Sequence, residues 1–415
     1  MEKILLESDA IKQFKLPDYH RQLYGKLPWE NHCTAILGPR GVGKTTLLLQ
    51  RLRDLDLPAT RAVYADMGDL YFAENRLYDF ARAYADQGGR YLLLDEVHRY
   101  PLGSWAQEIK LIVDRLRDKL TVVFTGSSVI KLPEGGADLS RRVLTYRLAG
   151  LSLREYLLLA HQIDLPIISL ERLLDADGRK DYLRNNAPAV DAFNLSHFDR
   201  YLQTGYYPYF LEGETGYINR INASVQLVLA ADIPHATATR ADNVLKLTRL
   251  LAAVADSVPF TPNLSKLGER VGISRNQLVD YLTALERANL LITLRKEVRG
   301  IAALGKPDKI YLDNPNLLNA LAPGRAERGT VRETFFANQL LQLTYTDGLL
   351  PPRLLLPKKG DFIWWDREAR TVFEVGGSGK THAQVRGEAN AYVVVDGLRA
   401  GGERRVPLWM FGLLY

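Results

Sequence analysis

The chain has almost no cysteine and no long apolar run. Its 415 residues include one cysteine, Cys33, so an internal disulfide framework and a zinc site built from cysteines are both excluded. No apolar run reaches about 18 residues, the length that a membrane-spanning helix requires. The N-terminus also lacks the apolar segment and cleavage site of a secretory signal. We therefore expect a cytoplasmic protein without a membrane partner, in which Cys33 is a small core residue.

Neither sign of charge dominates the composition. Lys and Arg number 54 and Asp and Glu 48, which gives a formal net charge of +6 and a pI near 9.1. This small basic excess is a hint of polyanionic partners. An apolar content of 47% and a charged content of 25% are typical of soluble globular proteins. The length predicts two to four domains, as an estimate from about 100–200 residues per domain.

The most informative stretch, GPRGVGKT, follows an apolar run at 34–37 and matches the pattern G-x-x-x-x-G-K-[ST]. Its glycines let backbone N–H groups turn inward, and the helix that follows adds its positive end. We expect Lys44 to reach the β- and γ-phosphates of ATP and Thr45 to take one position on Mg²⁺. The predicted nucleotide cradle consists of Gly38, Pro39, Arg40, Gly41, Val42, Gly43, Lys44, Thr45 and Thr46.

A second stretch, 90–95, is an apolar run that leads into two acids, Asp95 and Glu96. A buried parallel strand would deliver such carboxylates to the edge of a sheet. We expect Asp95 to hold Mg²⁺ and Glu96 to orient or deprotonate the attacking water. Placed after a phosphate-binding loop, the acidic pair predicts a nucleotide site.

Apolar strands alternate with amphipathic helices through the first 150 residues, which predicts a doubly wound α/β fold with a parallel sheet. The predicted strands are 33–37, 61–65, 90–95, 120–125 and 143–148. The fourth ends in Thr125 and Ser127, which we interpret as sensors of the γ-phosphate, a Ser/Thr-rich turn being the alternative. Arg141 and Arg142 precede the fifth strand and could reach a neighbouring subunit's γ-phosphate or form a solvated turn.

Residues 240–300 show the pattern of a winged helix-turn-helix. A short helix at 264–271 is followed by a turn and by a second helix, at whose start Ser274 and Gln277 form a capping box. The start of such a second helix enters the major groove of DNA, and a strand at 290–294 leads to a basic tip. The predicted DNA-contacting residues are Arg275, Asn276, Gln277, Arg295 and Lys296. Winged helices also dock proteins, which remains the alternative.

The C-terminal residues carry an incomplete nuclease pattern. A restriction-endonuclease-type site needs an Asp on one strand and Glu-x-Lys on the next, so that carboxylates hold Mg²⁺ and the lysine supports water. Asp361 and Glu374 fit, and Glu333 lies on a preceding helix. Gly376 occupies the lysine position, and Lys380 follows in a glycine-rich turn. The pattern favours a degenerate site kept for nucleic-acid binding or interaction, with cleavage as the alternative.

The segments GPRGVGKTTLL, LLLDEVHRYP, FTGSS and SRRV resemble the prokaryotic AAA-superfamily (AAA+) ATP-binding proteins of uncharacterised function. The resemblance covers nearly the whole chain. It implies an AAA+ core with strand order 5-1-4-3-2, followed by a helical lid, a winged helix and a degenerate endonuclease-like domain. It also implies that Arg141 or Arg142 acts as an arginine finger in a neighbouring subunit, hence a closed ring, most naturally a hexamer. Pro208 resembles the proline of the family's lid signature, which packs on adenine, although Thr204 replaces its first glycine and a plain Gly/Pro turn is the favoured alternative.

The sequence thus predicts a ring-forming ATPase that uses Mg²⁺ and binds or remodels DNA, branched or junction DNA being conceivable. A nucleotide-dependent switch with protein-binding C-terminal modules and an ATP-regulated nuclease are the alternatives. The predicted domains are the ATPase core with a helical lead-in at 1–150, the helical lid at 151–238, the winged helix at 239–302 and the endonuclease-like domain at 303–415.

Overall fold

A computed structural model describes residues 1–129, 139, 141–234, 243–259, 264–297, 307–344, 352–366 and 369–415. The chain divides into two compact units. The first is Met1–Ala149 together with a segment that begins at Ala231, and the second is Gly150–Ala230 together with the chain from Arg240 onward. The finer division into four domains stays a prediction. Within the ranges described, no helix is both long and apolar enough to cross a membrane.

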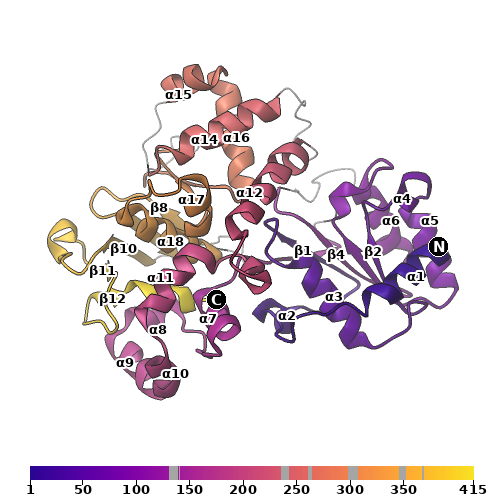
Figure 1. Cartoon of the computed structure of the whole chain (residues 1–415), viewed down its shortest axis with the longest axis horizontal. Helices are drawn as coiled ribbons and strands as arrows, with labels where there is room; N and C mark the ends of the chain where they lie inside the picture. Colours follow the sequence, from indigo (N-terminus) through magenta and orange to yellow (C-terminus); the bar gives the residue numbers. More distant parts are fainter. Residues whose placement is uncertain are drawn as a thin grey trace. The chain divides into compact units, whose positions relative to one another are not determined.

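The first unit is built on a five-stranded parallel sheet in the order β2-β3-β4-β1-β5 (Figure 1). This is the order 5-1-4-3-2 implied by the resemblance, so that prediction is confirmed. The strands are β1 (Cys33–Gly38), β2 (Ala62–Asp66), β3 (Tyr91–Asp95), β4 (Thr121–Ser127) and β5 (Leu144–Arg147). Because all five run in parallel, their carboxyl ends meet along one edge of the sheet, where ligands of such folds bind.

Helices cover this sheet, and α5 and α6 pack side by side (Figure 1). The helices are α1 (Glu2–Ile11), α2 (Gln22–Lys26), α3 (Lys44–Leu55), α4 (Tyr71–Glu74), α5 (Leu77–Asp86), η1 (Val97–Arg99) and α6 (Trp105–Leu116). The apolar side of α6 is buried through Ile109, Ile112 and Leu116, in one core with Phe124 of β4. Cys33 is fully buried, as expected of a small core residue.

The middle position of β1 brings its loop to the centre of the sheet edge. Gly38 ends β1, level with Ser127 of β4 on one side, and approaches β5 on the other. A Cβ added at Gly38 would lie 2.2 Å from the carbonyl oxygen of Leu148. Only glycine, which has no Cβ, allows the backbone at residue 38 to pass this close to the backbone of Leu148.

Helices dominate the first part of the second unit. They are α7 (Leu153–His161), α8 (Leu170–Leu174), α9 (Ala176–Asn185), α10 (Ala187–Ala192), α11 (Leu195–Thr204), η2 (Pro208–Glu212) and α12 (Tyr217–Leu227). A π-helical turn, η3 (Val228–Asp232), continues α12 into the segment that belongs to the first unit. The helical character of 151–238 was expected, and residues 235–242 lie outside the described ranges.

The middle of the second unit contains α14 (Val244–Ala255), α15 (Leu264–Val271) and α16 (Arg275–Arg287), which pack together (Figure 1). The predicted capping box is confirmed, because Ser274 and Gln277 bond each other's backbone N–H at the start of α16. Strand β6 (Leu291–Leu294) pairs antiparallel with β7 (Lys309–Leu312). Residues 298–306 lie outside the described ranges, and the identification of 239–302 as a winged helix stays a prediction.

The C-terminal part contains a five-stranded mixed sheet in the order β12-β11-β10-β9-β8. Its elements are α17 (Pro315–Leu321), α18 (Arg328–Gln342), β8 (Arg353–Leu355), β9 (Phe362–Asp366), β10 (Ala369–Gly376), η6 (His382–Val385), β11 (Ala391–Val395), β12 (Arg405–Pro407) and η7 (Leu408–Leu413). One core joins this sheet to the preceding helices, since Leu153, Tyr201, Phe335 and Phe411 belong to the same buried cluster. The second unit therefore has a continuous interior across the predicted lid and endonuclease-like segments.

Candidate nucleotide site

The loop between β1 and α3, which the sequence predicts to be a phosphate cradle, leads directly into the first turn of α3. Gly43 takes a left-handed conformation, with φ of 98°, as the N-cap of α3, so the helix begins at Lys44. The Lys44 ammonium donates hydrogen bonds to the carbonyl oxygens of Gly38 and Pro39, each at 3.0 Å. Burial lowers the pKa of Lys44, while the nearby Glu96 and Asp95 act in the opposite direction. A lysine held over its own loop at a helix N-terminus fits a triphosphate, which would supply oxygens in place of the two carbonyls.

Asp95 lies at the end of β3, where three hydroxyl groups converge on its carboxylate. Thr45 donates to Oδ2 at 2.7 Å and Tyr64 donates to Oδ2 at 2.9 Å, while Thr125 donates to Oδ1. The predicted magnesium ligands Thr45 and Asp95 are thus in direct contact. Hydroxyl and carboxylate oxygens are the ligands that Mg²⁺ prefers, so the pair fits this ion. Tyr64 was not anticipated, because nothing in the apolar sequence of β2 marks it.

Glu96 follows Asp95 in an unusual backbone conformation. Its φ of 53° and ψ of 49° are left-handed, which a non-glycine residue adopts only at a cost. The backbone N–H of Glu96 donates to the Thr125 hydroxyl at 3.0 Å. Because its hydroxyl also donates to Asp95, Thr125 connects Asp95 with Glu96. The role of Thr125 as a phosphate sensor stays a prediction. Ser127 is buried at the end of β4, where its hydroxyl accepts a bond from the N–H of Val129 at 3.5 Å.

Asp232 and His98, for which the sequence predicted no role, lie near Glu96 and the loop residue Arg40. Arg40 forms a two-pronged ion pair with Asp232, with Nη2 to Oδ1 at 2.8 Å and Nε to Oδ2 at 3.3 Å. The Nε2 of His98 lies 3.3 Å from Oε2 of Glu96 and 3.5 Å from Oδ1 of Asp232. No local signal marks Asp232, which is remote in sequence. His98 stands two residues after Glu96, and its position just past the strand was the only available hint.

The electrostatics of this group favour an ionised Asp232. The Asp232 side chain is 1% exposed, and burial alone would raise its pKa. His98 and Arg40 outweigh burial and lower the pKa of Asp232 below its usual range. The His98 side chain is only 6% exposed, and neither ring nitrogen makes a hydrogen bond of good geometry with any described residue.

The two candidate finger arginines differ in their surroundings. Arg142 pairs with Asp114 of α6, with Nε to Oδ1 at 2.6 Å. Arg141 is exposed at the turn before β5. Residues 130–138 and 140 lie outside the described ranges. Arg142 would have to leave this ion pair to reach another subunit.

Pro208 and the turn before it belong to the second unit. The N–H of Tyr206 donates to Oδ1 of Asn316 at 2.7 Å, and the amide of Asn316 donates to the carbonyl oxygens of Tyr201 and Leu202. The turn that resembles a lid signature is thus anchored to α17 by buried hydrogen bonds. Contact of Pro208 with a nucleotide stays a prediction.

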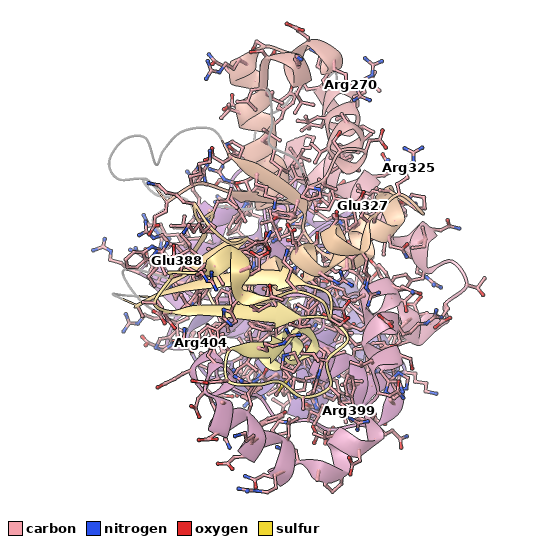
Figure 2. The ribbon with its side chains drawn as sticks, turned by 90° about the vertical axis from the view of Figure 1, so that its left-hand side faces the viewer. Arg270, Arg325, Glu327, Glu388, Arg399 and Arg404 are labelled. Carbon is pink, nitrogen blue, oxygen red and sulfur yellow. The ribbon has the colours of Figure 1, made fainter. Side chains whose placement is uncertain are left out.

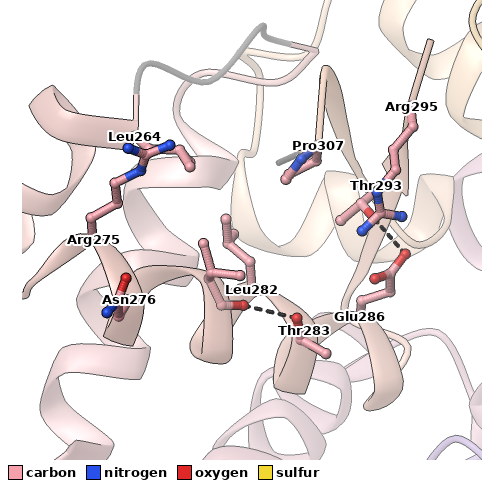
Figure 3. A pocket seen from close by; sticks show the side chains of 10 residues that line it. Leu264, Arg275, Asn276, Leu282, Thr283, Glu286, Thr293, Arg295 and Pro307 are labelled. Atoms are coloured by element: carbon pink, nitrogen blue, oxygen red, sulfur yellow. Dashed lines mark hydrogen bonds between the residues drawn. The ribbon is translucent and has the colours of Figure 1, made fainter. Parts of the chain in front are cut away.

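Three of the five predicted DNA-contacting residues line one cavity of about 430 Å³ (Figure 3). Arg275 and Asn276 lie on one side of it and Arg295 on the other. Its lining residues are Leu264, Arg275, Asn276, Val279, Leu282, Thr283, Glu286, Thr293, Arg295 and Pro307. Arg275, Asn276 and Gln277 are exposed, as is Lys296. The Gln277 side-chain oxygen already accepts a bond from the N–H of Ser274 at 3.2 Å, so capping occupies part of this amide.

The three acids of the predicted nuclease site have close cationic or N–H partners. Glu333 accepts bonds from Lys309 at 2.8 Å and from Tyr311 at 2.7 Å. Asp361 accepts a bond from the N–H of Val375 at 2.8 Å. Burial, with Glu333 next in effect, raises the pKa of Asp361 to about 6. Among the residues described, no group of three or more His, Cys, Asp or Glu side chains is arranged to hold a metal ion.

The glycine-rich turn after β10 returns a lysine to this site. Lys380 Nζ lies 2.6 Å from Oε1 of Glu374, and a Cβ at Gly376 would come within 2.8 Å of the Lys380 side chain. Lys380 therefore occupies the space beside the position where the usual pattern has its lysine.

A separate cavity of about 510 Å³ lies near η6, and Figure 2 shows two of its lining residues, Glu388 and Arg404, next to the C-terminal sheet.

Comparison with known families places an AAA domain at residues 30–157 and a domain of unknown function at residues 195–328. Each match covers less than half of the chain. The second match spans the end of the predicted lid and the whole predicted winged helix. No curated protein matches the chain. The chain thus contains an AAA domain, the kind of domain found in P-loop ATPases, and most of it lies in the first unit.

Solved structures show only distant similarity. DnaA from Aquifex aeolicus bound to AMPPCP is 14% identical over 66% of this chain and 90% of its own, with a TM-score of 0.29. The RuvB Holliday junction branch migration motor of Thermotoga maritima is 16% identical over 71% of this chain and 88% of its own, with a TM-score of 0.26. PCH-2 of C. elegans is 15% identical over 41% of this chain, with a TM-score of 0.24, and the chain spans about half of its length (51%). Similarity at this level carries no inference about activity.

Proposed function

We propose that the first unit hydrolyses ATP with Mg²⁺. The observation that carries this proposal is the contact between Thr45 and Asp95, which joins the phosphate loop to the acidic end of β3 at 2.7 Å. Lys44 on one side and Glu96 on the other supply the two further groups that phosphoryl transfer to water requires. Their proximity, with Lys44 Nζ 3.8 Å from Oε1 of Glu96, supports a single site.

Each of these side chains has a distinct part in the reaction. We expect Lys44 to exchange the carbonyl oxygens of Gly38 and Pro39 for phosphate oxygens when ATP binds. Glu96 accepts a proton from the water whose oxygen attacks the γ-phosphorus, as the bond to the ADP oxygen breaks. Thr125 fixes the backbone of Glu96 through the 3.0 Å hydrogen bond. Mg²⁺, when bound, neutralises charge on the phosphate oxygens.

Two substitutions test these assignments. Glu96→Gln should retain ATP binding and lose turnover by about 10²- to 10⁴-fold, the usual contribution of a general base. Lys44→Ala should instead weaken binding of ATP itself. Titration of a fluorescent ATP analogue and single-turnover hydrolysis separate the two effects. A Glu96→Gln protein that hydrolyses ATP at the wild-type rate would contradict the assignment.

We further infer that the ATPase works as a homo-oligomeric ring, most naturally a hexamer, that binds or remodels DNA. The exposed Arg275 and Asn276 at the start of α16 and Arg295 across the same cavity support DNA contact. Branched DNA would suit a ring that presents several such modules. DNA that raises the ATPase rate would favour this function, whereas a rate unaffected by DNA would favour the nucleotide-dependent switch. Electron microscopy with ATP and DNA tests ring formation and DNA occupancy together.

One observation favours a second candidate, an ATP-regulated nuclease. The sequence pattern has Gly376 where a nuclease of this type has its lysine, but Lys380 Nζ lies 2.6 Å from Oε1 of Glu374 and so places an ammonium group beside the predicted site. Mg²⁺-dependent cleavage of DNA that is lost in both Asp361→Ala and Lys380→Met would establish this activity. The matched control is Lys358→Met, because Lys358 is an exposed lysine. No cleavage by the wild-type protein would remove this candidate and leave the ATPase proposal intact.

A further inference from the structure

The buried ion pair between Arg40 and Asp232 lies beside the carboxylate of Glu96. Asp232 is almost completely buried, and both of its oxygens accept bonds from the Arg40 guanidinium. A two-pronged bond of this kind fixes the orientation as well as the position of an arginine. Arg40 belongs to the phosphate loop itself, so Asp232 determines where one cation of the nucleotide site points.

Glu96 is surrounded by groups that compete for its carboxylate. Oε2 lies 3.6 Å from Nη2 of Arg40 and 3.3 Å from Nε2 of His98, and Oε1 lies 3.8 Å from Nζ of Lys44. A full ion pair with a cation would fix the orientation of the Glu96 carboxylate toward that cation. The same pair would also occupy the oxygen that must face water. Arg40 is therefore useful near Glu96 only if another group holds it at its present distance.

We propose that Asp232 is a positioning residue for ATP hydrolysis, which holds Arg40 so that Oε2 of Glu96 stays available to the attacking water. This inference rests on the proposed ATPase function. Arg40 is closer to Asp232, at 2.8 Å, than to Glu96, at 3.6 Å. The Nε2 of His98 lies between the two carboxylates, within 3.5 Å of each. Without the Asp232 charge, Arg40 would turn to Glu96, whose Oε2 lies 3.6 Å from its Nη2.

Stability alone does not account for this pair. A buried ion pair adds little net stability, because the loss of hydration offsets the attraction between the charges. The same unit contains a matched example, Glu108, whose side chain is 7% exposed and pairs with Arg76 at 2.7 Å. Glu108 lies on α6, and its carboxylate also accepts the N–H of Tyr78 at 2.8 Å. Both acids are largely buried and paired with an arginine, whereas Arg76 bonds one oxygen of Glu108 and is 57% exposed, and of the two acids Asp232 adjoins Glu96.

Asp232→Asn is the central test, with Glu108→Gln as the matched control. Single-turnover ATP hydrolysis by Asp232→Asn should fall at least about tenfold, as misplacement near a reacting group does. Its affinity for the fluorescent ATP analogue should change less than about threefold, because positioning acts on the reaction rather than on binding. Glu108→Gln should leave both quantities within about twofold, although it loses a similar ion pair.

A double-variant cycle identifies the mechanism. In an Arg40→Met background, adding Asp232→Asn should lower the hydrolysis rate less than about threefold, because the guanidinium that would close on Glu96 is already absent. A drop of tenfold or more in that background overturns the inference. This comparison also decides the matter if Asp232→Asn alone does not fold, since the double variant removes both partners and leaves no unpaired buried charge.

The remaining outcomes separate this inference from the function on which it rests. If the wild-type protein hydrolyses ATP and Asp232→Asn does so within twofold, the inference fails and the ATPase stands. If Asp232→Asn loses affinity as much as turnover, Asp232 serves binding and the inference also fails. A wild-type protein that binds ATP without hydrolysing it would overturn the ATPase proposal itself.

Discussion

The hydroxyl of Thr45 donates a hydrogen bond to Oδ2 of Asp95 over 2.7 Å, which joins the first turn of α3 to the end of β3. The two residues are remote in sequence, and the parallel sheet brings them together because β1 and β3 both end at the same edge. This contact concentrates the oxygen ligands of the nucleotide site.

Asp95→Asn should remove most of the effect of Mg²⁺ on nucleotide affinity. Loss of the charged ligand should reduce the Mg²⁺-dependent gain by about tenfold or more, equivalent to one charged interaction of about 1.5–3 kcal/mol. The matched control is Tyr64→Phe, which removes another hydroxyl from the same carboxylate but no expected metal ligand. Titrations of ATP analogue with and without Mg²⁺ measure both. Equal Mg²⁺ dependence in Asp95→Asn and the wild type would contradict the assignment.

Arg141 and Arg142 should respond differently to alanine. Arg141→Ala should lower turnover by about 10³-fold if it is a finger, and turnover should recover on mixing with Glu96→Gln subunits that keep Arg141. Arg142→Ala should instead cost about 0–1 kcal/mol of stability, because its partner Asp114 is partly exposed. Steady-state ATPase assays of the variants, alone and mixed, measure these effects. If neither substitution changes turnover, the finger acting between subunits is ruled out.

Arg275→Ala should weaken DNA binding, and the slope of log affinity against log salt should decrease by about one if the guanidinium contacts a phosphate. Gln277→Ala should mainly destabilise the start of α16, by about 0.5–2 kcal/mol, because the capping box uses its side chain. Fluorescence anisotropy with duplex DNA, together with thermal unfolding, distinguishes the two. Unchanged affinity in Arg275→Ala would favour the protein-docking alternative for this module.

Asp396→Asn should destabilise the second unit in a pH-dependent way. Asp396 is 6% exposed and accepts bonds from Arg328 at 2.9 Å and Arg332 at 2.8 Å. Burial alone would raise the pKa of Asp396, but the two arginines outweigh burial and lower it. Its contribution is therefore complete above the unfolded pKa of about 3.9 and is lost as pH falls through the lower folded pKa.

At pH 7 the cost of Asp396→Asn should be about 2–3 kcal/mol, as for hydrogen bonds to charged groups. The difference from wild type should diminish below about pH 4, where the carboxylate begins to protonate in the unfolded chain. Denaturant unfolding at several pH values measures this. The control is Asp199→Asn, which removes the 45% exposed second partner of Arg328 and should cost only about 0–1 kcal/mol. A cost for Asp396→Asn that stays constant down to pH 3 would contradict the prediction.

The sequence predicted the elements whose signals are local. The strand order followed from the resemblance, and the contact between Thr45 and Asp95 agrees with the roles expected of a phosphate loop and an acidic strand end. The capping box of Ser274 and Gln277 was readable because both partners lie within one turn. The capping residues belong to one motif, and Thr45 and Asp95 belong to two motifs that the sequence already marked.

Contacts that depend on long-range packing could not be predicted. Asp232 reaches Arg40 from a segment that returns to the first unit after most of the helical region, and its own neighbours in sequence are ordinary. The return of Lys380 to Glu374 depends on how a glycine-rich turn closes, which composition does not determine. The shared core of the second unit likewise emerges only once helices and sheet are packed together.

The close passage of Gly38 beside Leu148 affects how loop mutants should be interpreted. A side chain at Gly38 would collide with the backbone of the neighbouring strand, so a variant there that fails to bind ATP would report a disrupted sheet. At Gly43 the surrounding space is open and only the left-handed φ of 98° resists a side chain. A substitution at Gly38 therefore tests the packing of the sheet, whereas one at Gly43 tests the backbone conformation of the loop. A substitution at Lys44 should lower nucleotide affinity with the least damage to the sheet.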